Sequence, residues 1–213
     1  MLFRSNGIGM AGLAHGAKVL PVRVLGRCGG YMSDIADAIV WASGGDVPGV
    51  PANPTPAEVI NMSLGGESPC DDVMQAAIDT AVANGTTVVV SAGNSNADTA
   101  NFAPASCNNV INVGASRVGG GKAYYSNFGK RVDISAPGGG AGQDGVPNGY
   151  VWQTLNDSPT EPEKGTPVYG GMAGTSMAAP HVSATVALLQ SIAPRPLTPA
   201  EVRATMPAVF PAR

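Results

Sequence analysis

The chain has 213 residues, which is enough for one sizeable domain. Hydrophobic residues make up 44% of it and charged residues only 13%, and it contains 29 glycines, so the composition indicates a compact, loop-rich globular domain. The net charge of −3 gives no reason to expect a nucleic-acid or anionic-membrane partner, and no apolar run reaches the length of a membrane-spanning helix. Residues 1–12 lack the charged start, apolar stretch and cleavage site of a signal peptide.

Strand-like and helix-like runs alternate along the chain. Lys18–Leu25 is an apolar run that we interpret as a buried strand, and Ser33 is expected to cap a helix over 34–43. The later elements are a strand at 59–64, a helix at 71–84, strands at 86–91, 110–113 and 132–134, a helix from Ser176 to about 192, and a final helix opened by the capping box Thr198–Glu201. Residues 44–57 and 138–170 are rich in glycine and proline, which predicts loops. This alternation predicts an α/β fold with a mainly parallel sheet.

A small polar stretch at the start of the last long helix contains a candidate nucleophile. Gly174 and Thr175 lead into Ser176, and Pro180 fits only if the helix starts near Ser176, because the first four helical N–H groups have no intrahelical partner. The Ser176 hydroxyl then lies at a helix N-terminus, where the backbone dipole favours developing negative charge. Such a serine can act as a nucleophile, although the stretch by itself fits equally a helix whose N-cap is Thr175 or Ser176.

Two further segments follow predicted strands, at the edge of an open α/β sheet where ligands bind. Ser91–Asn94 closes the strand at 86–91, and the side-chain amide of Asn94 could donate to an oxyanion. Ser63–Gly66 follows the neighbouring strand, and its glycines would let a peptide backbone approach and pair as an extra strand. Each segment taken alone fits a simple loop at least as well.

The three cysteines do not have the spacing of a metal site, and their loop settings suit a disulfide better. A bridge between Cys28 and Cys70 would close a loop of about 40 residues and stabilise the fold by ~4 kcal/mol in the chain-entropy estimate. One thiol is then left over. Three reduced thiols are the alternative.

Taken together, these segments resemble the subtilisin-like (S8) serine proteases, and the resemblance runs across nearly all of the chain. Gly174–His181 is similar to the nucleophile signature of that family, Ser91–Asn94 to its oxyanion segment, and Ser63–Gly66 to its substrate-binding strand. Segments that match the family framework follow in the same order: Lys18–Leu25, Asn109–Ala115, Tyr125–Gly129 and Val132–Gly138. The loops at 26–30 and 44–57 most resemble those of secreted bacterial extracellular proteases.

The resemblance implies a three-layer α/β sandwich that hydrolyses peptide bonds through an acyl-enzyme on Ser176. The side chain of Asn94 and the backbone N–H of Ser176 would hold the oxyanion. The residues implied in substrate binding are Ser63, Leu64, Gly65, Ala92, Gly93 and Thr175. No cofactor is required for this chemistry. The implied partners are protein or peptide substrates and a pro-segment in the precursor, and the implied protein is a secreted monomer.

The sequence departs from the family pattern at the other two members of the catalytic triad. In this family the order along the chain is Asp, His and then Ser, and the first two precede a stretch like Gly7–Gly12, where this chain begins. His15 lies in a turn before a predicted strand, and His181 lies at a framework position in the nucleophile helix, so neither is expected to be the general base.

We therefore expect residues 1–213 to be the C-terminal two thirds of a peptidase S8 domain, truncated at the N-terminus and lacking the first strands of the sheet. Such a chain is expected to be inactive alone and poorly stable. The alternatives are a non-catalytic, pseudoprotease-like module that binds peptides and the non-functional product of a misplaced gene start.

Two further expectations concern calcium and the disulfide. The segment at 104–110 together with Asp133 resembles a calcium site of proteinase K-like subtilases, in which the backbone carbonyls of Asn108 and Val110 would join the Asp133 carboxylate. Asp133 as a hydrogen-bond acceptor at a strand end is the alternative. Some subtilases pair a cysteine at the Cys28 position with one upstream of the catalytic His; within this chain, Cys28–Cys70 is the pair that we expect.

Overall fold

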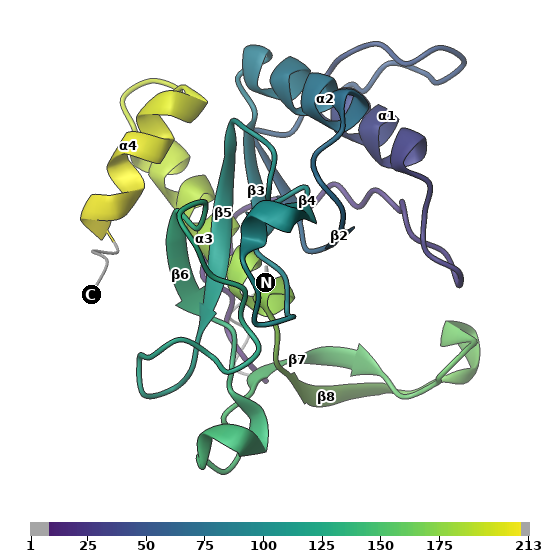
Figure 1. Cartoon of the computed structure of the whole chain (residues 1–213). Helices are drawn as coiled ribbons and strands as arrows, with labels where there is room; N and C mark the ends of the chain where they lie inside the picture. Colours follow the sequence, from purple (N-terminus) through teal and green to yellow (C-terminus); the bar gives the residue numbers. More distant parts are fainter. Residues whose placement is uncertain (1–8, 210–213) are drawn as a thin grey trace.

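The computed structural model describes residues 9–209, and it places a parallel sheet between two layers of helices (Figure 1). The sheet has the strand order β1-β3-β5-β6. Its strands are β1 (Val59–Met62), β3 (Thr87–Ser91), β5 (Val110–Ser116) and β6 (Ile134–Pro137). All neighbouring strands run parallel. The predicted α/β fold with a mainly parallel sheet is confirmed.

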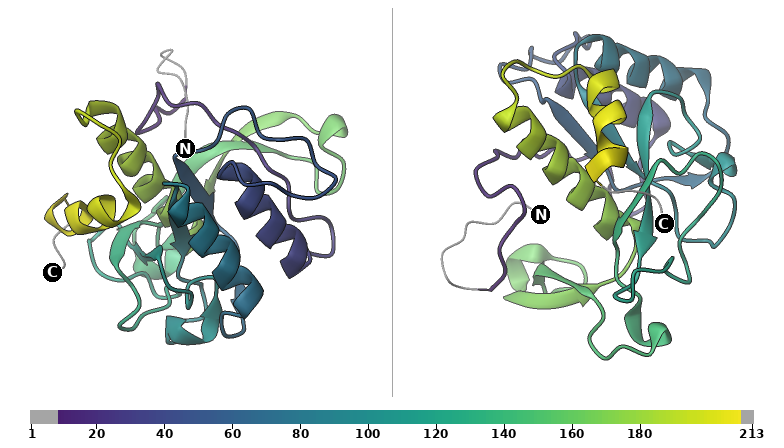
Figure 2. Two further views of the ribbon diagram at one scale, coloured as in Figure 1. Left: turned by 90° about the horizontal axis from the view of Figure 1, so that it is seen from above. Right: turned by 90° about the vertical axis from the view of Figure 1, so that its left-hand side faces the viewer.

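Each face of the sheet is covered by two helices. The helices α1 (Met32–Ala42) and α2 (Asp72–Ala83) lie on one face, and α3 (Thr175–Ile192) and α4 (Pro199–Val209) lie on the other (Figures 1 and 2). Because successive side chains of a strand point to opposite faces, β3 contributes to both cores. The core under α1 and α2 contains Ile35, Ile39, Met74, Ile78, Val88 and Val90, and the core under α3 and α4 contains Val89, Ile111, Val113, Val182, Val186 and Val202.

The expected helices are confirmed, with small changes at their ends. The Asp71 side chain accepts from the Met74 backbone N–H at 2.7 Å and so caps α2. The capping box is present at α4, where Thr198 N–H donates to the Glu201 carboxylate at 2.9 Å and Glu201 N–H donates to the Thr198 hydroxyl. The helix α1 begins at Met32, and Ser33 is not its cap. Within the described residues no helix is long and apolar enough to cross a membrane.

The expected strand at Lys18–Leu25 is not formed. The segment has no strand assignment, and Val19 is 62% exposed, with Leu20, Val22 and Leu25 also exposed. Apolar residues form a buried strand only when a neighbouring strand supplies hydrogen bonds and two layers supply cover. Among residues 9–209, the strand β1 pairs with β3 on one edge and with no strand on the other. The glycine-rich stretch Gly7–Gly12 lies partly outside the described residues.

The Gly/Pro-rich region 138–170 contains a hairpin that the sequence did not indicate. Here β7 (Val151–Asn156) and β8 (Pro167–Met172) pair antiparallel, with short 3₁₀ turns at Ala141–Asp144 and Pro162–Lys164. The hairpin projects away from the helices and the parallel sheet (Figures 1 and 2). A third, smaller sheet joins β2 (Gly66–Glu67) to β4 (Phe102–Ala103), next to a 3₁₀ turn at Thr99–Asn101.

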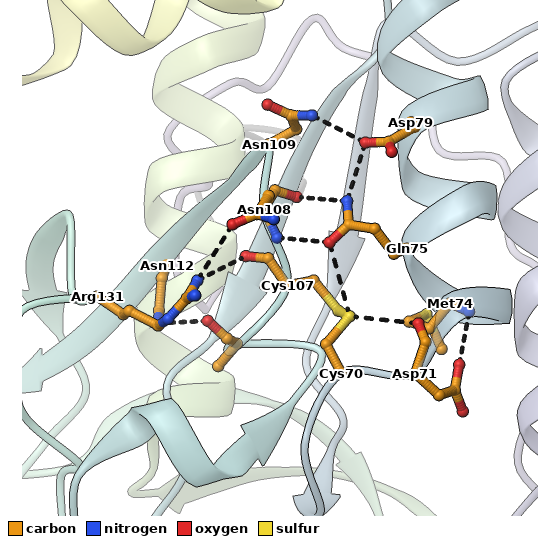
Figure 3. Close-up of a disulfide and its surroundings, with 11 residues drawn as sticks. Cys70, Asp71, Met74, Gln75, Asp79, Cys107, Asn108, Asn109, Asn112 and Arg131 are labelled. Atoms are coloured by element: carbon orange, nitrogen blue, oxygen red, sulfur yellow. Dashed lines mark hydrogen bonds between the residues drawn. A yellow bond between two sulfur atoms is a disulfide. The ribbon is translucent and has the colours of Figure 1, made fainter.

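The disulfide joins Cys70 to Cys107, so the expected Cys28–Cys70 pair is wrong (Figure 3). Cys70 precedes α2 and Cys107 precedes β5, and the packing of these two elements brings their Cα atoms to 5.1 Å. Gln75 joins the same two segments, because its side chain accepts from the Asn108 N–H at 2.8 Å and donates to the Asn108 carbonyl at 3.3 Å. Cys28 is a free, exposed thiol.

Candidate active site

Ser176 is the second residue of α3, close to the predicted helix start. Pro180 is the sixth residue of this helix, beyond the positions that have no intrahelical partner, so it leaves the Ser176 carbonyl without its usual helical donor. The hydroxyl of Ser63 donates to that carbonyl at 2.8 Å. The Ser176 hydroxyl donates to the Ser63 carbonyl at 3.4 Å in return. Ser63 therefore holds the helix start against the segment that follows β1.

A second set of bonds fixes the start of α3 to the segment that follows β3. The side-chain oxygen of Asn94 accepts from both the backbone N–H and the hydroxyl of Thr175, each at 2.8 Å. The Thr175 hydroxyl also accepts from the Gly93 N–H at 3.2 Å, and Thr175 is fully buried. These contacts bring together predicted site residues that are more than 80 positions apart along the chain.

The two donors to Asn94 also settle the orientation of its amide. A backbone N–H can only donate, so the atom that it meets must be the amide oxygen, and the amide nitrogen lies on the other side. That nitrogen lies 3.5 Å from the position that a Cβ on Gly174 would take, and Asn94 is exposed. The amide nitrogen is thus a donor on the open side of the turn that contains Ser176.

Asn127 is a site residue that the sequence analysis missed. Its buried side chain accepts from the N–H groups of Ser95 at 2.9 Å and Ala97 at 3.1 Å, and it donates to the Ala92 carbonyl at 2.9 Å. Gly93 has a φ of 104°, and a Cβ there would lie 2.3 Å from the Asn127 amide nitrogen, so only glycine fits. Asn127 shapes the loop that presents Asn94. The framework match at Tyr125–Gly129 was the available signal, but it assigned no role.

The backbone before Ser176 is anchored from a third direction. The Gly174 N–H donates to the Gly138 carbonyl at 2.9 Å, and the Tyr125 hydroxyl donates to the same carbonyl at 2.8 Å. Burial raises the pKa of the Tyr125 hydroxyl to about 12, so Tyr125 remains a proton donor at all ordinary pH values. The turn Gly174–Ser176 is therefore held by segments that follow β1, β3 and β6.

Neither described histidine forms a hydrogen bond with Ser176. His181 donates from Nδ1 to the Met177 carbonyl at 2.8 Å, and burial lowers the pKa of its imidazole. His181 and Ser176 line one cavity of about 130 Å³, together with residues 10–13, 151–153, 177 and 180. His15 is exposed in a turn. Within residues 9–209, the partner of the Ser176 hydroxyl is the Ser63 carbonyl rather than a base.

The remaining predicted substrate-binding residues lie at the same edge of the sheet. Ser63 and Leu64 are half-buried and Gly65 is exposed, immediately after β1. Ala92 is buried and Gly93 is half-buried, immediately after β3. Because β1 and β3 are parallel neighbours, these two segments meet at one edge, and Ser176 lies beside them. The structure thus gathers all eight predicted catalytic and substrate-binding residues in one place.

Two residues of the expected calcium site, Asp133 and Asn108, already bond to groups of the protein. One oxygen of Asp133 is engaged by the guanidinium of Arg203, and the other accepts from the Asn112 N–H at 2.8 Å. The Asn108 carbonyl accepts from Gln75. Calcium needs at least six oxygen ligands with free lone pairs. Asp133 is thus a hydrogen-bond acceptor beside a strand, as in the alternative, and calcium at this place stays a prediction.

Comparison with known proteins gives the family context of this site. The model of the Subtilase family (peptidase S8) matches residues 1–208. The chain is 56% identical over 198 residues to an extracellular protease of Xanthomonas campestris pv. campestris, and 46% identical over 201 residues to an extracellular basic protease of Dichelobacter nodosus. Each alignment covers 93% of this chain, but only 32% and 31% of those proteins. The chain thus spans about a third of the length of the curated relatives that it matches.

Solved structures agree with the sequence comparison. A protease from Pseudoalteromonas arctica PAMC 21717 superposes with a TM-score of 0.90 at 50% identity, over 97% of this chain and 61% of the other. A cold-adapted subtilisin-like serine proteinase superposes with a TM-score of 0.72 at 28% identity, over 92% of this chain and 62% of the other.

Proposed function

The chain belongs to the subtilase family of serine proteases, and from this premise we propose that it supplies the nucleophile and the oxyanion donors of a secreted serine endopeptidase. The proposal rests on the hydrogen bonds that join Ser63 and Asn94 to the turn at Ser176. The names of the two bacterial relatives, both extracellular proteases, support secretion. A pro-segment in the precursor and a monomeric enzyme are part of the same proposal.

In this proposal the Ser176 hydroxyl attacks the carbonyl carbon of the scissile peptide bond and forms an acyl-enzyme. The developing oxyanion accepts hydrogen bonds from the Asn94 amide nitrogen and the Ser176 backbone N–H, which is free at the helix N-terminus. The amide nitrogen of Asn94 is pre-oriented because its oxygen is held by Thr175. Preorganised donors of this kind stabilise the transition state without reorganising during the reaction.

The substrate backbone is proposed to lie along the segment that follows β1. Ser63, Leu64 and Gly65 precede the short strand β2, and Gly65 is exposed, although a Cβ on it would meet the Ala103 carbonyl at 2.6 Å. Ser63 also bonds Ser176, so a chain paired with this segment lies beside the nucleophile. An extended peptide would add to the sheet edge through backbone hydrogen bonds, while neighbouring pockets select side chains.

Among residues 9–209, no general base contacts the Ser176 hydroxyl. The Ser176 hydroxyl donates to a backbone carbonyl, and His181 is engaged with Met177. We therefore propose that the chain alone does not hydrolyse peptides and that the full-length protein contributes the acid and the base of the triad. The alternative, a module that binds peptides without cleaving them, is favoured by the same lack of a base among the described residues.

The decisive experiment changes Ser176 in the full-length protein. Ser176→Ala should lower kcat on a peptide substrate by ~10⁶, which is the magnitude found for the nucleophile of subtilisin, a member of the same family. Asn94→Ala should lower kcat by ~10²–10³, again as in subtilisin. Ser191→Ala, in the exposed last turn of the same helix, is the matched control and should leave kcat unchanged. Full activity of the Ser176→Ala variant would refute the proposed function.

A separate experiment tests the isolated chain. A serine-directed phosphonate should not label Ser176 in residues 1–213, because no base among the described residues activates the hydroxyl. Rapid stoichiometric labelling, abolished by Ser176→Ala, would contradict this. The binding alternative requires that the unlabelled chain still binds peptides and that the full-length protein also binds them without cleavage.

A further inference from the structure

The hairpin β7–β8 exposes several large apolar side chains. We call residues 151–172 the arm. Trp152, Leu155, Val168, Tyr169 and Met172 are all large apolar residues of the arm that are at least a third exposed. The arm projects away from the helices and the parallel sheet (Figure 1). Leu155, Val168 and Met172 lie on one face of the arm, and Trp152 and Tyr169 lie on the other. Exposed apolar surface that is contiguous often marks an interaction site.

The strand register divides these side chains between the two faces of the arm. Leu155 lies opposite Val168, and Val151 lies opposite Met172, so these four side chains share one face. Between the two pairs stands Gly170, and a Cβ there would lie 2.4 Å from Leu155 Cδ1. Leu155 therefore lies over Gly170, between the two pairs, while the polar residue Gln153 stands opposite Gly170 on the same face. We call the surface made by Val151, Leu155, Val168 and Met172 the apolar strip.

The strip leads directly to the candidate nucleophile. Its inner end, Met172, is the last residue of β8 and precedes Ser176 by four positions. Residues 151–153 of β7 line the same cavity as Ser176. Each strand of the arm has six residues. At about 3.3 Å per residue, the arm can align about six residues of an extended chain beyond the cleft.

The far end of the arm has an excess of negative charge. Residues 157–164 contain the carboxylates of Asp157, Glu161 and Glu163, against the single ammonium of Lys164. All four side chains are exposed, and Lys164 pairs with Glu161. A bound polypeptide that continues past the strip would meet this tip. Charge complementarity therefore favours a polypeptide with apolar residues followed by basic ones.

We propose that the apolar strip docks an extended, apolar segment of a protein substrate outside the cleft, with basic residues of that segment facing the tip. The proposal rests on the proposed function, because it treats the Ser176 cleft as the place of cleavage. It adds a substrate class: extended polypeptides long enough to occupy the arm and the cleft together. Short peptides would use the cleft alone.

The test in the full-length protein compares a long substrate with a short one. The double variant Leu155→Ser/Val168→Ser removes the outer half of the strip, away from Ser176. Its kcat/KM on β-casein, an unstructured protein, should fall about tenfold, while kcat/KM on a tetrapeptide p-nitroanilide stays unchanged. The control Thr154→Ala, on the other face of the arm, should change neither value. Equal losses on both substrates, or no loss on either, would overturn the proposal.

A binding measurement separates this proposal from catalysis. In the Ser176→Ala background, the Kd for fluorescein-labelled β-casein should rise about tenfold when Leu155→Ser/Val168→Ser is added. An unchanged Kd would refute docking even if Ser176 proves to be the nucleophile. If the Ser176→Ala variant retains full hydrolysis, the proposed function is refuted. The Kd measurement still tests whether the arm docks β-casein.

Two other occupants of the strip give distinct results. If a second copy of the protein covers the strip, sedimentation should show a dimer that Leu155→Ser/Val168→Ser converts to a monomer. If another segment of the full-length protein covers it, the double variant should destabilise that protein while leaving the Kd for β-casein unchanged. Either result would overturn docking of substrate.

Discussion

Two apolar runs of this chain have similar composition and opposite environments. The strand β3 (Thr87–Ser91) lies between β1 and β5, and all five of its residues are buried. Lys18–Leu25 also consists mainly of valine and leucine, yet it forms no strand, and Val19 is 62% exposed. The difference lies in the neighbours. A strand is buried when other strands pair with both of its edges and helices cover both faces, and of these two runs β3 alone has them.

The candidate site also combines a well-anchored segment, the one after β3, with a segment that lies before α1. The segment after β3 is fixed by Asn127, by Thr175 and by the start of α3. The region before α1 contributes residues 10–13, which line the cavity beside Ser176. We call residues 15–28 the N-terminal segment. It contains Val19, Arg23 and Cys28, which serve below as controls for substitutions in the rest of the protein.

The largest expected effect comes from the disulfide. Cys70→Ser/Cys107→Ser opens a loop with a sequence separation of 37 residues. It should lower the free energy of unfolding by ~4 kcal/mol in the chain-entropy estimate. Urea unfolding without reductant measures this. Cys28→Ser, in the N-terminal segment, should change it by less than about 0.5 kcal/mol, because that thiol is free and exposed. If Cys28→Ser lowers the free energy of unfolding as much as the double variant does, the expected difference between the two thiol environments is refuted.

The next effect concerns the loop after β3. Asn127→Ala removes three hydrogen bonds to backbone groups and leaves the buried Ala92 carbonyl without this donor. It should lower the free energy of unfolding by about 3 kcal/mol. In the full-length enzyme kcat should fall by a larger factor than KM rises, because Asn94 loses its support. Arg23→Ala, which removes one exposed hydrogen bond to Leu25, is the control and should be neutral.

The two runs can be compared directly with one chemical change. Val89→Ala deletes two methyl groups from a fully buried side chain, and urea unfolding should show a loss of about 2 kcal/mol. Val19→Ala makes the same deletion where the side chain is mostly exposed, and it should cost less than about 0.5 kcal/mol. Similar losses at both positions would mean that Lys18–Leu25 is buried in solution.

The smallest effect is a change in pH dependence. Burial lowers the pKa of His181, so the folded protein holds this side chain neutral below the pH at which the unfolded chain takes up a proton, about 6.5. The unfolded state then binds more protons, and stability falls as the pH drops from about 6.5 towards the lowered pKa. His181→Gln should make this decline shallower in denaturation curves between about pH 7 and 5.

Local patterns predicted most of the fold. The helices α2 and α3 and the strand β3 lie close to their expected positions, because apolar periodicity and caps such as Asp71 are properties of neighbouring residues. The hairpin β7–β8 was missed, since its glycines and prolines indicate loops. In the structure Gly170 has a different role, because it makes room for the Leu155 side chain.

The sequence by itself determined the family, the α/β class and the residues of the candidate site, because Ser176, Asn94 and Ser63 each stand in a recognisable local segment. Only the tertiary structure decided which cysteines pair, that Lys18–Leu25 stays exposed, and that the carboxylate of Asp133 is engaged by Arg203. It also showed why Ser63 matters to the nucleophile turn: Pro180 leaves the Ser176 carbonyl free, and Ser63 bonds it. These outcomes depend on segments far apart in the sequence, and a local pattern contains no information about which distant segment will lie beside it.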